Sequence, residues 1–301
     1  MKKMLSLVMA ITMCLSLAAC SGGTTSQGES SQSPAASTPA ASTPAASSSQ
    51  GASSTPADAE SDLAYVQDQG TLYVGITNFA PMDYKEAGSD EWIGFDADMA
   101  KAFAESLGVN VEFQEITWDY KVQELDSKTI DCVWNGMTIN DEVTAAMAVS
   151  DPYCTNYQVL VYPADRADEF EGLTSLEGLY VAVESGSAGE DAAEALGADI
   201  VPVQAQSNTL MEVQSGNSDA AVIDVLMAAA MTGEGTSYAD LAYSLNLNDA
   251  QGLESEQYGV GFRQGSDLVD EFNTFWAEKV ADGTVLEVAT TYGLQDAVIL
   301  G

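Results

Sequence analysis

From residue 71 onward, strand-like and helix-like segments alternate along the chain, and this order limits the fold more than any other feature of the sequence. Thr71–Ile76 and Val109–Phe113 have the short apolar pattern of β-strands. Between them, apolar residues recur every four positions and indicate a helix: Phe95, Met99, Phe103 and Leu107. We expect Asp96 to cap this helix and Gly108 to end it. A strand, a helix and a second strand predict a right-handed βαβ unit in a parallel sheet.

The same alternation continues through the rest of the chain. Further strands are predicted at 130–134, 157–162, 179–183, 200–203, 220–223 and 256–262. Further helices are predicted at 118–128, 190–196, 209–215, 266–281 and 285–292. Two α/β units in series predict two lobes that face each other. Because a strand and two helices follow the second unit, we expect the chain to return to the first lobe.

The segment Asp131–Val143 joins a predicted strand to a group of polar residues. We expect the strand to stop at Gly136, where the backbone can approach a ligand closely. Thr138 and Asn140 follow, and open α/β sheets hold small molecules at such an edge. The segment therefore predicts part of a ligand site. The alternative is an ordinary turn into a helix that begins at Asn140.

The first residues have the pattern of a secretory signal. Lys2 and Lys3 precede an apolar run that is too short to span a membrane as a stable helix. The run ends in Leu-Ala-Ala-Cys, which resembles the lipobox of bacterial lipoproteins. We therefore expect a signal peptide at 1–19 and lipidation of Cys20, which would become the mature N-terminus. The alternative is cleavage that leaves a soluble secreted protein.

The segment that follows is built from serine, alanine, proline and threonine, with a five-residue repeat that starts at Pro34, Pro39 and Pro44. Such a composition has too little apolar surface to offset the entropy of ordering the chain. Residues 20–61 are therefore predicted to be a disordered linker that holds the folded part away from a membrane surface.

The sequence has 46 acidic and 9 basic residues, and its formal net charge is −37. This balance argues against a nucleic-acid partner, because phosphate contacts require a basic face. The acidic residues either keep the surface solvated or attract a cationic ligand.

The chain has no histidine, so the commonest general base and metal ligand are missing. No cysteine cluster has the spacing of a zinc site. We predict no catalytic residue, no metal and no cofactor. Cys132 and Cys154 lie in apolar, strand-like contexts and are expected to be buried thiols, although export would permit a disulfide.

Several short motifs, in a fixed order, point to one family. They are Phe79-Ala-Pro81, Gly94-Phe-Asp-Ala-Asp-Met99, Gly136-Met-Thr138, Ser150-Asp-Pro-Tyr153, Ser185-Gly-Ser187, Asp224 and Glu256-Gln-Tyr-Gly-Val-Gly261. Together they resemble the family 3 solute-binding proteins of ABC transporters, which are receptors for polar amino acids. The resemblance spans about Asp62 to Leu300.

The resemblance implies a two-lobed α/β clamp of the periplasmic-binding-protein type, which closes on its ligand by hinge motion. Lobe 1 would comprise residues 62–157 and 258–301, and lobe 2 would comprise 158–257. The hinge strands would lie near Asn156–Val159 and Gln257–Gly261.

In lobe 1, the resemblance implies that Phe79 stacks on the ligand and that Trp134 lies on the strand that leads into the cleft. Asn135, Gly136 and Thr138 would offer a carbonyl, an amide and a hydroxyl to the ligand's head group. The alternative for Phe79 and Trp134 is that they are core aromatic residues.

In lobe 2, Ser185, Gly186 and Ser187 would open a helix whose amides suit a carboxylate. Asp224 would receive the ligand's ammonium group. Asp224 could also cap the helix that follows it, and Glu184 could be an ordinary solvated acid at a strand end.

Two positions depart from the family pattern. Val143 stands where members that bind amino acids usually have an arginine for the α-carboxylate, and Glu184 stands where the glutamine receptor has a lysine. Among the basic residues, only Lys85 is predicted near a cleft loop. The hypothesis that follows is a ligand that is a small cationic amine or a basic amino acid, bound by Asp224 with Glu184 or Asp83.

The resemblance predicts a monomeric, lipid-anchored, extracytoplasmic binding protein that delivers a small ligand to an ABC permease and its ATPase. It predicts no enzyme activity. Two alternatives stay open: a sensing protein without a transport role, and an enzyme similar to cyclohexadienyl dehydratases, which would need a carboxylate, tyrosine or lysine as its acid or base.

Overall fold

The computed structural model describes residues 61–251 and 255–301. The predicted signal peptide, Cys20 and the linker as far as residue 60 lie outside these residues. Within the described part of the chain, no helix is both long enough and apolar enough to cross a membrane.

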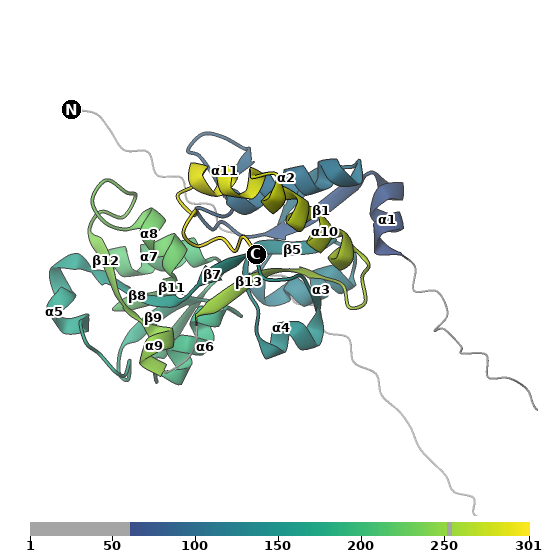
Figure 1. Cartoon of the computed structure of the whole chain (residues 1–301). Helices are drawn as coiled ribbons and strands as arrows, with labels where there is room; N and C mark the ends of the chain where they lie inside the picture. Colours follow the sequence, from purple (N-terminus) through teal and green to yellow (C-terminus); the bar gives the residue numbers. More distant parts are fainter. Residues whose placement is uncertain (1–60, 252–254) are drawn as a thin grey trace, which may run out of the picture. The chain divides into compact units, whose positions relative to one another are not determined.

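Lobe 1 is built on a six-stranded sheet with the order β4-β1-β5-β13-β6, and β7 also pairs with β13 (Figure 1). The strands are β1 (Thr71–Ile76), β4 (Asn110–Glu115), β5 (Cys132–Thr138), β6 (Ala148–Val149), β7 (Cys154–Asn156) and β13 (Glu256–Phe262). β1 is parallel to β4 and β5, which confirms the predicted βαβ unit, whereas β13 is antiparallel to β5. A small hairpin, β2 (Tyr84–Lys85) and β3 (Trp92–Ile93), precedes the first long helix.

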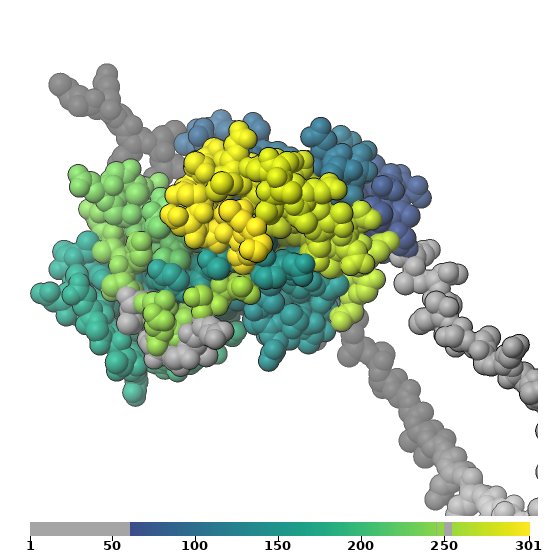
Figure 2. Space-filling model, in the orientation of Figure 1, coloured from purple at the N-terminus to yellow at the C-terminus, as the bar shows by residue number. Residues whose placement is uncertain are grey.

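The helices of lobe 1 cover its sheet. They are α2 (Phe95–Leu107), α3 (Lys121–Asp126), α4 (Asp141–Ala146), α10 (Leu268–Ala281) and α11 (Thr284–Thr291), together with a 3-10 turn at Trp118–Tyr120. The two predicted C-terminal helices, α10 and α11, pack against α2 and form much of one face of lobe 1 (Figure 2). Phe272 and Phe275 of α10 meet Phe103 of α2 in a buried core.

Lobe 2 is built on a five-stranded sheet with the order β10-β9-β11-β8-β12. The strands are β8 (Gln158–Pro163), β9 (Tyr180–Glu184), β10 (Asp199–Val203), β11 (Ala220–Asp224) and β12 (Leu241–Asn246). The helices are α5 (Ala167–Phe170), α6 (Ala188–Ala195), α7 (Gln206–Ser215), α8 (Val225–Met231) and α9 (Leu247–Gln251), with a 3-10 turn at Ala164–Arg166. β12 was not predicted, although Leu241, Tyr243 and Leu245 alternate with smaller or polar residues, and α9 is too short to show a helical period.

The chain passes between the sheets twice. β7 ends at Asn156 in the first sheet and β8 begins at Gln158 in the second, so only Tyr157 separates them. The return is made by β13, which pairs with β7 through Glu256↔Asn156 and Tyr258↔Cys154. The two crossings lie side by side, because β7 and β13 pair with each other. A change in a few backbone angles there can turn one lobe against the other.

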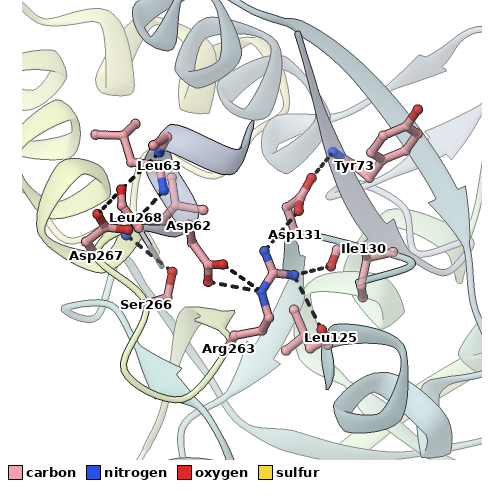
Figure 3. A network of polar contacts seen from close by, with 12 residues as sticks. Asp62, Leu63, Tyr73, Leu125, Ile130, Asp131, Arg263, Ser266, Asp267 and Leu268 are labelled. Atoms are coloured by element: carbon pink, nitrogen blue, oxygen red, sulfur yellow. Dashed lines mark hydrogen bonds and ion pairs between the residues drawn. The ribbon is translucent and has the colours of Figure 1, made fainter. Parts of the chain in front are cut away.

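A buried polar network ties the first described helix, α1 (Asp62–Gln69), to the end of β13 (Figure 3). The Arg263 guanidinium donates to Asp62 through Nε and to Asp131 through a terminal nitrogen at 3.0 Å. It also donates to the Ile130 carbonyl at 2.7 Å. Asp131 in turn accepts from the Tyr73 amide. The network therefore joins β1 and the start of β5, and it links the N-terminal and C-terminal segments of the chain that form lobe 1.

Two local predictions were wrong. β5 does not stop at Gly136 but continues to Thr138, because glycine accepts the positive φ of 56° and the ring of Phe79 fills the place of a side chain. Asp96 does not cap α2, whose cap position is Gly94 without a side-chain bond. The Asp96 carboxylate is buried and accepts from the Gly136 amide of β5 instead.

Cys132 and Cys154 are both buried, free thiols, as predicted. Burial raises the pKa of each thiol, so both stay protonated at neutral pH. They behave as small apolar groups within the core of lobe 1.

Candidate functional site

A cavity of about 110 Å³ lies between the lobes and is lined by both. Lobe 1 contributes Phe79, Trp118, Asp119, Lys121, Val122, Asn135, Gly136, Met137, Thr138, Asn140, Glu142, Val143, Ala146 and Met147. Lobe 2 contributes Glu184, Gly186, Ser187, Ala188, Asp191, Gln206 and Asp224. The lobe 2 acids come from the carboxyl ends of β9 and β11 and from α6, so the parallel order of the sheet brings them together.

Most of the ligand residues expected from the sequence meet at this cavity. Those on its wall are Phe79, Asn135, Gly136, Thr138, Glu184, Gly186, Ser187 and Asp224. Trp134 and Ser185 are not on the wall. Trp134 is fully buried and packs edge-on against Phe272 with 4.9 Å between ring centroids, so it is a core residue of lobe 1.

Phe79 is both a core residue and part of the cavity wall. It is 3% exposed and meets the Tyr258 ring edge-on, with 6.4 Å between centroids. Its ring also lies where a Cβ at position 136 would be, so only glycine fits there. The two interpretations of Phe79 left open by the sequence are therefore compatible.

In lobe 1, the polar groups that were expected to contact a ligand's head group form hydrogen bonds to other groups of the protein instead. Asn135 accepts from Thr77 and donates to the Asp83 carboxylate at 2.7 Å. The Gly136 amide donates to Asp96 at 2.8 Å. The Thr138 hydroxyl donates to Glu256 at 3.0 Å.

Asp83 and Asp96 lie behind this wall and are fully buried. Burial, with the neighbouring Asp96, raises the pKa of Asp83 well above its ordinary value. Burial also raises the pKa of Asp96 to about 7, although Tyr153 and the Gly136 amide donate to it. Neither carboxylate lines the cavity, so Asp83 is not part of the recognition site.

Asp224 ends β11 and is 5% exposed. Its side chain makes no cap bond to α8, although it holds the cap position. It accepts instead from Tyr258 at 2.7 Å, from Gln158 at 3.1 Å, and from Asn156 and Gln206. Burial and the nearby Glu256 raise the pKa of Asp224 to about 6.

Glu184 ends β9 on the neighbouring parallel strand and is 4% exposed. Burial and the Asp224 carboxylate raise the pKa of Glu184 to about 8. Among the described residues, its Oε1 atom has no hydrogen-bond partner. A buried carboxylate oxygen on a cavity wall without a donor favours a ligand that supplies one.

At the start of α6, the carboxylate of Glu190 from the same helix takes the place expected for a ligand carboxylate. The Gly186 amide donates to Glu190 at 2.7 Å, and the Ser187 hydroxyl accepts from the Glu190 amide at 3.2 Å. The Ser185 and Ser187 amides donate to the Val203 and Glu184 carbonyls. The three residues expected to bind a ligand carboxylate through their amides therefore use those amides inside lobe 2.

Sequence reasoning missed several cavity residues, among them Trp118 and Lys121. Both follow β4 in a short turn, where Trp118 precedes Lys121 by three positions and the lysine ammonium lies over the indole ring, 4.9 Å from its centroid. An aromatic residue and a cation after a strand could have signalled them. Lys85, the basic residue expected near the cleft, is exposed and lies over Trp92 instead.

The wall around Val143 is apolar. Val143 is 6% exposed and shares a buried cluster with Met137 and Met147, against which Val122 and Ala146 pack. No residue of α4 is basic, so this helix supplies no substitute for the arginine that the family pattern usually has at position 143. Among the described residues, no group of three or more acidic or cysteine side chains is arranged to hold a metal ion.

Two α/β lobes, a double crossing between them and a cavity lined by both define a solute-binding protein. The chain belongs to the bacterial extracellular solute-binding proteins, family 3, whose sequence model matches residues 72–295. Both the family and the two-lobed fold predicted from the sequence are thus confirmed.

Relatives of known role fit this family. The arginine-binding extracellular protein ArtP of Bacillus subtilis is 30% identical over 217 residues, which cover 68% of this chain and 79% of ArtP. A substrate-binding protein of an ABC uptake transporter from Streptococcus pneumoniae, solved with bound histidine, is 27% identical with a TM-score of 0.68, and the match covers 78% and 97% of the two chains. An ancestral amino acid-binding protein, a precursor of cyclohexadienyl dehydratase, is 31% identical with a TM-score of 0.68. That match covers 77% of this chain and 99% of the ancestral protein.

Proposed function

We propose that this chain is the extracytoplasmic receptor of an ABC importer and that it binds a basic amino acid or a small cationic amine. The observation that carries the proposal is the charge of the cavity between the lobes. Its wall has carboxylates from both lobes at Asp119, Glu142, Glu184, Asp191 and Asp224, against one lysine. A cationic ligand would lower the repulsion among these groups.

Recognition would centre on Glu184 and Asp224, with Phe79 and Trp118 beside the ligand. Glu184 has an unpartnered oxygen, whereas Asp224 already accepts from four side chains. Glu184 is therefore the stronger candidate for direct contact with a cation. Asp224 would act mainly through its charge and by holding Gln206 and Tyr258 in place.

The remaining features of the proposal concern the whole protein. The lobes would be residues 62–157 with 258–301 and residues 158–257, and the chain would act as a monomer. Lipid on Cys20 would anchor it to the outer face of the cell membrane, where it would deliver ligand to its permease.

Binding without catalysis is favoured over a dehydratase-like activity. The relatives reported above are described as binding proteins, including the ancestral precursor. Glu184 and Asp224, the buried carboxylates of the cavity, have raised pKa values, as catalytic acids often do. Both nevertheless lie among groups that suit ligand recognition. Turnover of prephenate or arogenate by the purified protein would contradict this part of the proposal.

The ligand class can be tested by thermal-shift and calorimetric screens of amino acids and amines, with mass spectrometry of any ligand released by denaturing the protein. We expect a response to arginine, lysine, histidine or their amine analogues. Strong binding of glutamate or aspartate without any response to cationic ligands would overturn the proposal.

A further inference from the structure

The cavity has few groups left to hold a ligand carboxylate. The amides of Gly136 and Gly186 already donate to Asp96 and Glu190, and the Thr138 hydroxyl donates to Glu256. On α4, the Val143 side chain packs in an apolar cluster with Met137 and Met147 and offers no donor. A carboxylate that enters this cavity would be held most strongly by a cationic donor, which these elements do not supply.

Lys121 is positioned to be that donor. It is the first residue of α3 and lines the cavity next to Val122. Its ammonium donates across the cleft to the Gly186 carbonyl at 3.1 Å and, weakly, to the Trp118 carbonyl at 3.4 Å. An ammonium has three N–H groups, so one remains for a ligand.

The charge of Lys121 has no direct counterpart in the protein. Within residues 61–251 and 255–301, no ion pair includes Lys121. Burial lowers the pKa of Lys121, while the more distant carboxylates of Glu142, Glu184 and Asp119 oppose that shift. A partly buried cation on a cavity wall is stabilised when a ligand brings an anion to it.

The opposite requirement is met at Glu184 in lobe 2. This carboxylate is buried, lines the same cavity and has an oxygen without a donor among the described residues. The cavity therefore has a cation without a counter-ion in lobe 1 and, in lobe 2, a carboxyl group that a bound cation would hold in its ionised form. A ligand with one group of each sign completes both and bridges the lobes.

We propose that Lys121 binds the carboxylate of a basic amino acid while Glu184 binds the cationic group at the ligand's other end. The inference rests on the proposed function and narrows it, because a simple amine would satisfy Glu184 but not Lys121. The Trp118 ring, already beneath the ammonium, would fix the position of Lys121.

Pairs of ligands that differ only in the carboxylate test this inference: arginine with agmatine, lysine with cadaverine, and histidine with histamine. Calorimetry on the full-length protein, freed of bound ligand, should show at least about tenfold tighter binding of the amino acid in one pair. In Lys121→Met the amino acid should lose at least that factor, whereas its amine partner should bind equally or more tightly.

Two further variants separate a binding role from a structural one. Lys121→Arg keeps the charge and should retain the preference for the amino acid. Glu184→Gln should weaken both members of the pair by a similar factor. Thermal unfolding of each variant would verify that the fold is intact.

The inference is overturned if wild-type protein prefers the amine, or if Lys121→Met weakens both members of the pair equally. In the first case the proposed function stands and only the assignment of Lys121 fails. If no member of any pair binds and an acidic amino acid does, both are wrong.

Discussion

Arg263 holds two carboxylates in the interior of lobe 1, Asp62 and Asp131, and all three side chains are at most 10% exposed. Asp131 also accepts from Gln69 and from the Tyr73 amide, and the guanidinium also donates to two backbone carbonyls. Figure 3 shows the guanidinium bonded to Asp62 and to Asp131. The network therefore depends on a complete set of partners rather than on any single ion pair.

Arg263→Met should destabilise the protein by about 3–5 kcal/mol, because it leaves two buried carboxylates without their cation. Chemical denaturation, with the free energy of unfolding extrapolated to water, measures this loss. The matched control is Arg166→Met, since Arg166 pairs with Glu169 on the surface with side chains 37% and 58% exposed. Its loss should stay below about 1 kcal/mol. Equal losses in both variants would show that burial does not decide the cost.

At this scale the sequence was informative about residue type but not about partners. Asp96, Asn135 and Thr138 were predicted to serve a helix cap or a ligand, and the structure gives them partners far away in the chain. Such pairings depend on which elements become neighbours, and a local pattern does not contain that information. Trp118 and Lys121 were missed for the same reason.

The two parallel strands β9 and β11 of lobe 2 end in Glu184 and Asp224, which places two carboxylates at one edge of the sheet. The sequence predicted both strand ends and the edge itself. The effect of their proximity on ionisation could not be predicted, because it depends on burial. Burial and the Asp224 carboxylate raise the pKa of Glu184 to about 8, whereas burial and Glu256 raise the pKa of Asp224 to about 6.

Between about pH 5 and about pH 8, the ligand-free protein should lose stability as the pH rises. Glu184 has a pKa of about 8 in the folded protein and an ordinary value of 4.5, so over this range the folded state holds the proton that the unfolded state has released. Asp224 acts in the same direction over a lower range, from 3.8 to about 6. Thermal unfolding at a series of pH values measures the trend.

Glu184→Gln supplies the control for this trend, because glutamine keeps the shape and does not titrate. Its melting temperature should fall less steeply with pH than that of the wild type. Parallel curves for the two proteins would mean that Glu184 has no raised pKa and that other buried acids, such as Asp83 and Asp96, cause the slope.

Across the whole folded part, the sequence predicted two α/β lobes, the order of most elements and the return of the chain through β13. Those predictions succeeded because strand and helix periods are local properties and because the family motifs are spread along the chain. The closeness of the lobes was not predictable. It depends on contacts such as Gln204 with Thr117, at 3.2 Å, and Lys121 with Gly186.

Gly186 tests whether this closeness is required for binding. Its φ is 73°, and a Cβ there would lie 2.9 Å from the Cα and Oδ1 atoms of Asp119 in lobe 1. Gly186→Ala should therefore hold the lobes apart and weaken binding of the co-purified ligand by at least about tenfold. Small-angle X-ray scattering at saturating ligand should give a larger radius of gyration for the variant than for the wild type.

The comparison that isolates the contact between lobes is Gly178→Ala. Gly178 has a φ of 82°, but no atom lies within 4 Å of the position its Cβ would take. Both alanine variants should lose about 1–2 kcal/mol of stability from the left-handed backbone, because that cost is local. Only Gly186→Ala should lose affinity and compactness. If both variants bind ligand equally well, the lobes can close without the contact at Gly186, and cavity charge alone must account for recognition.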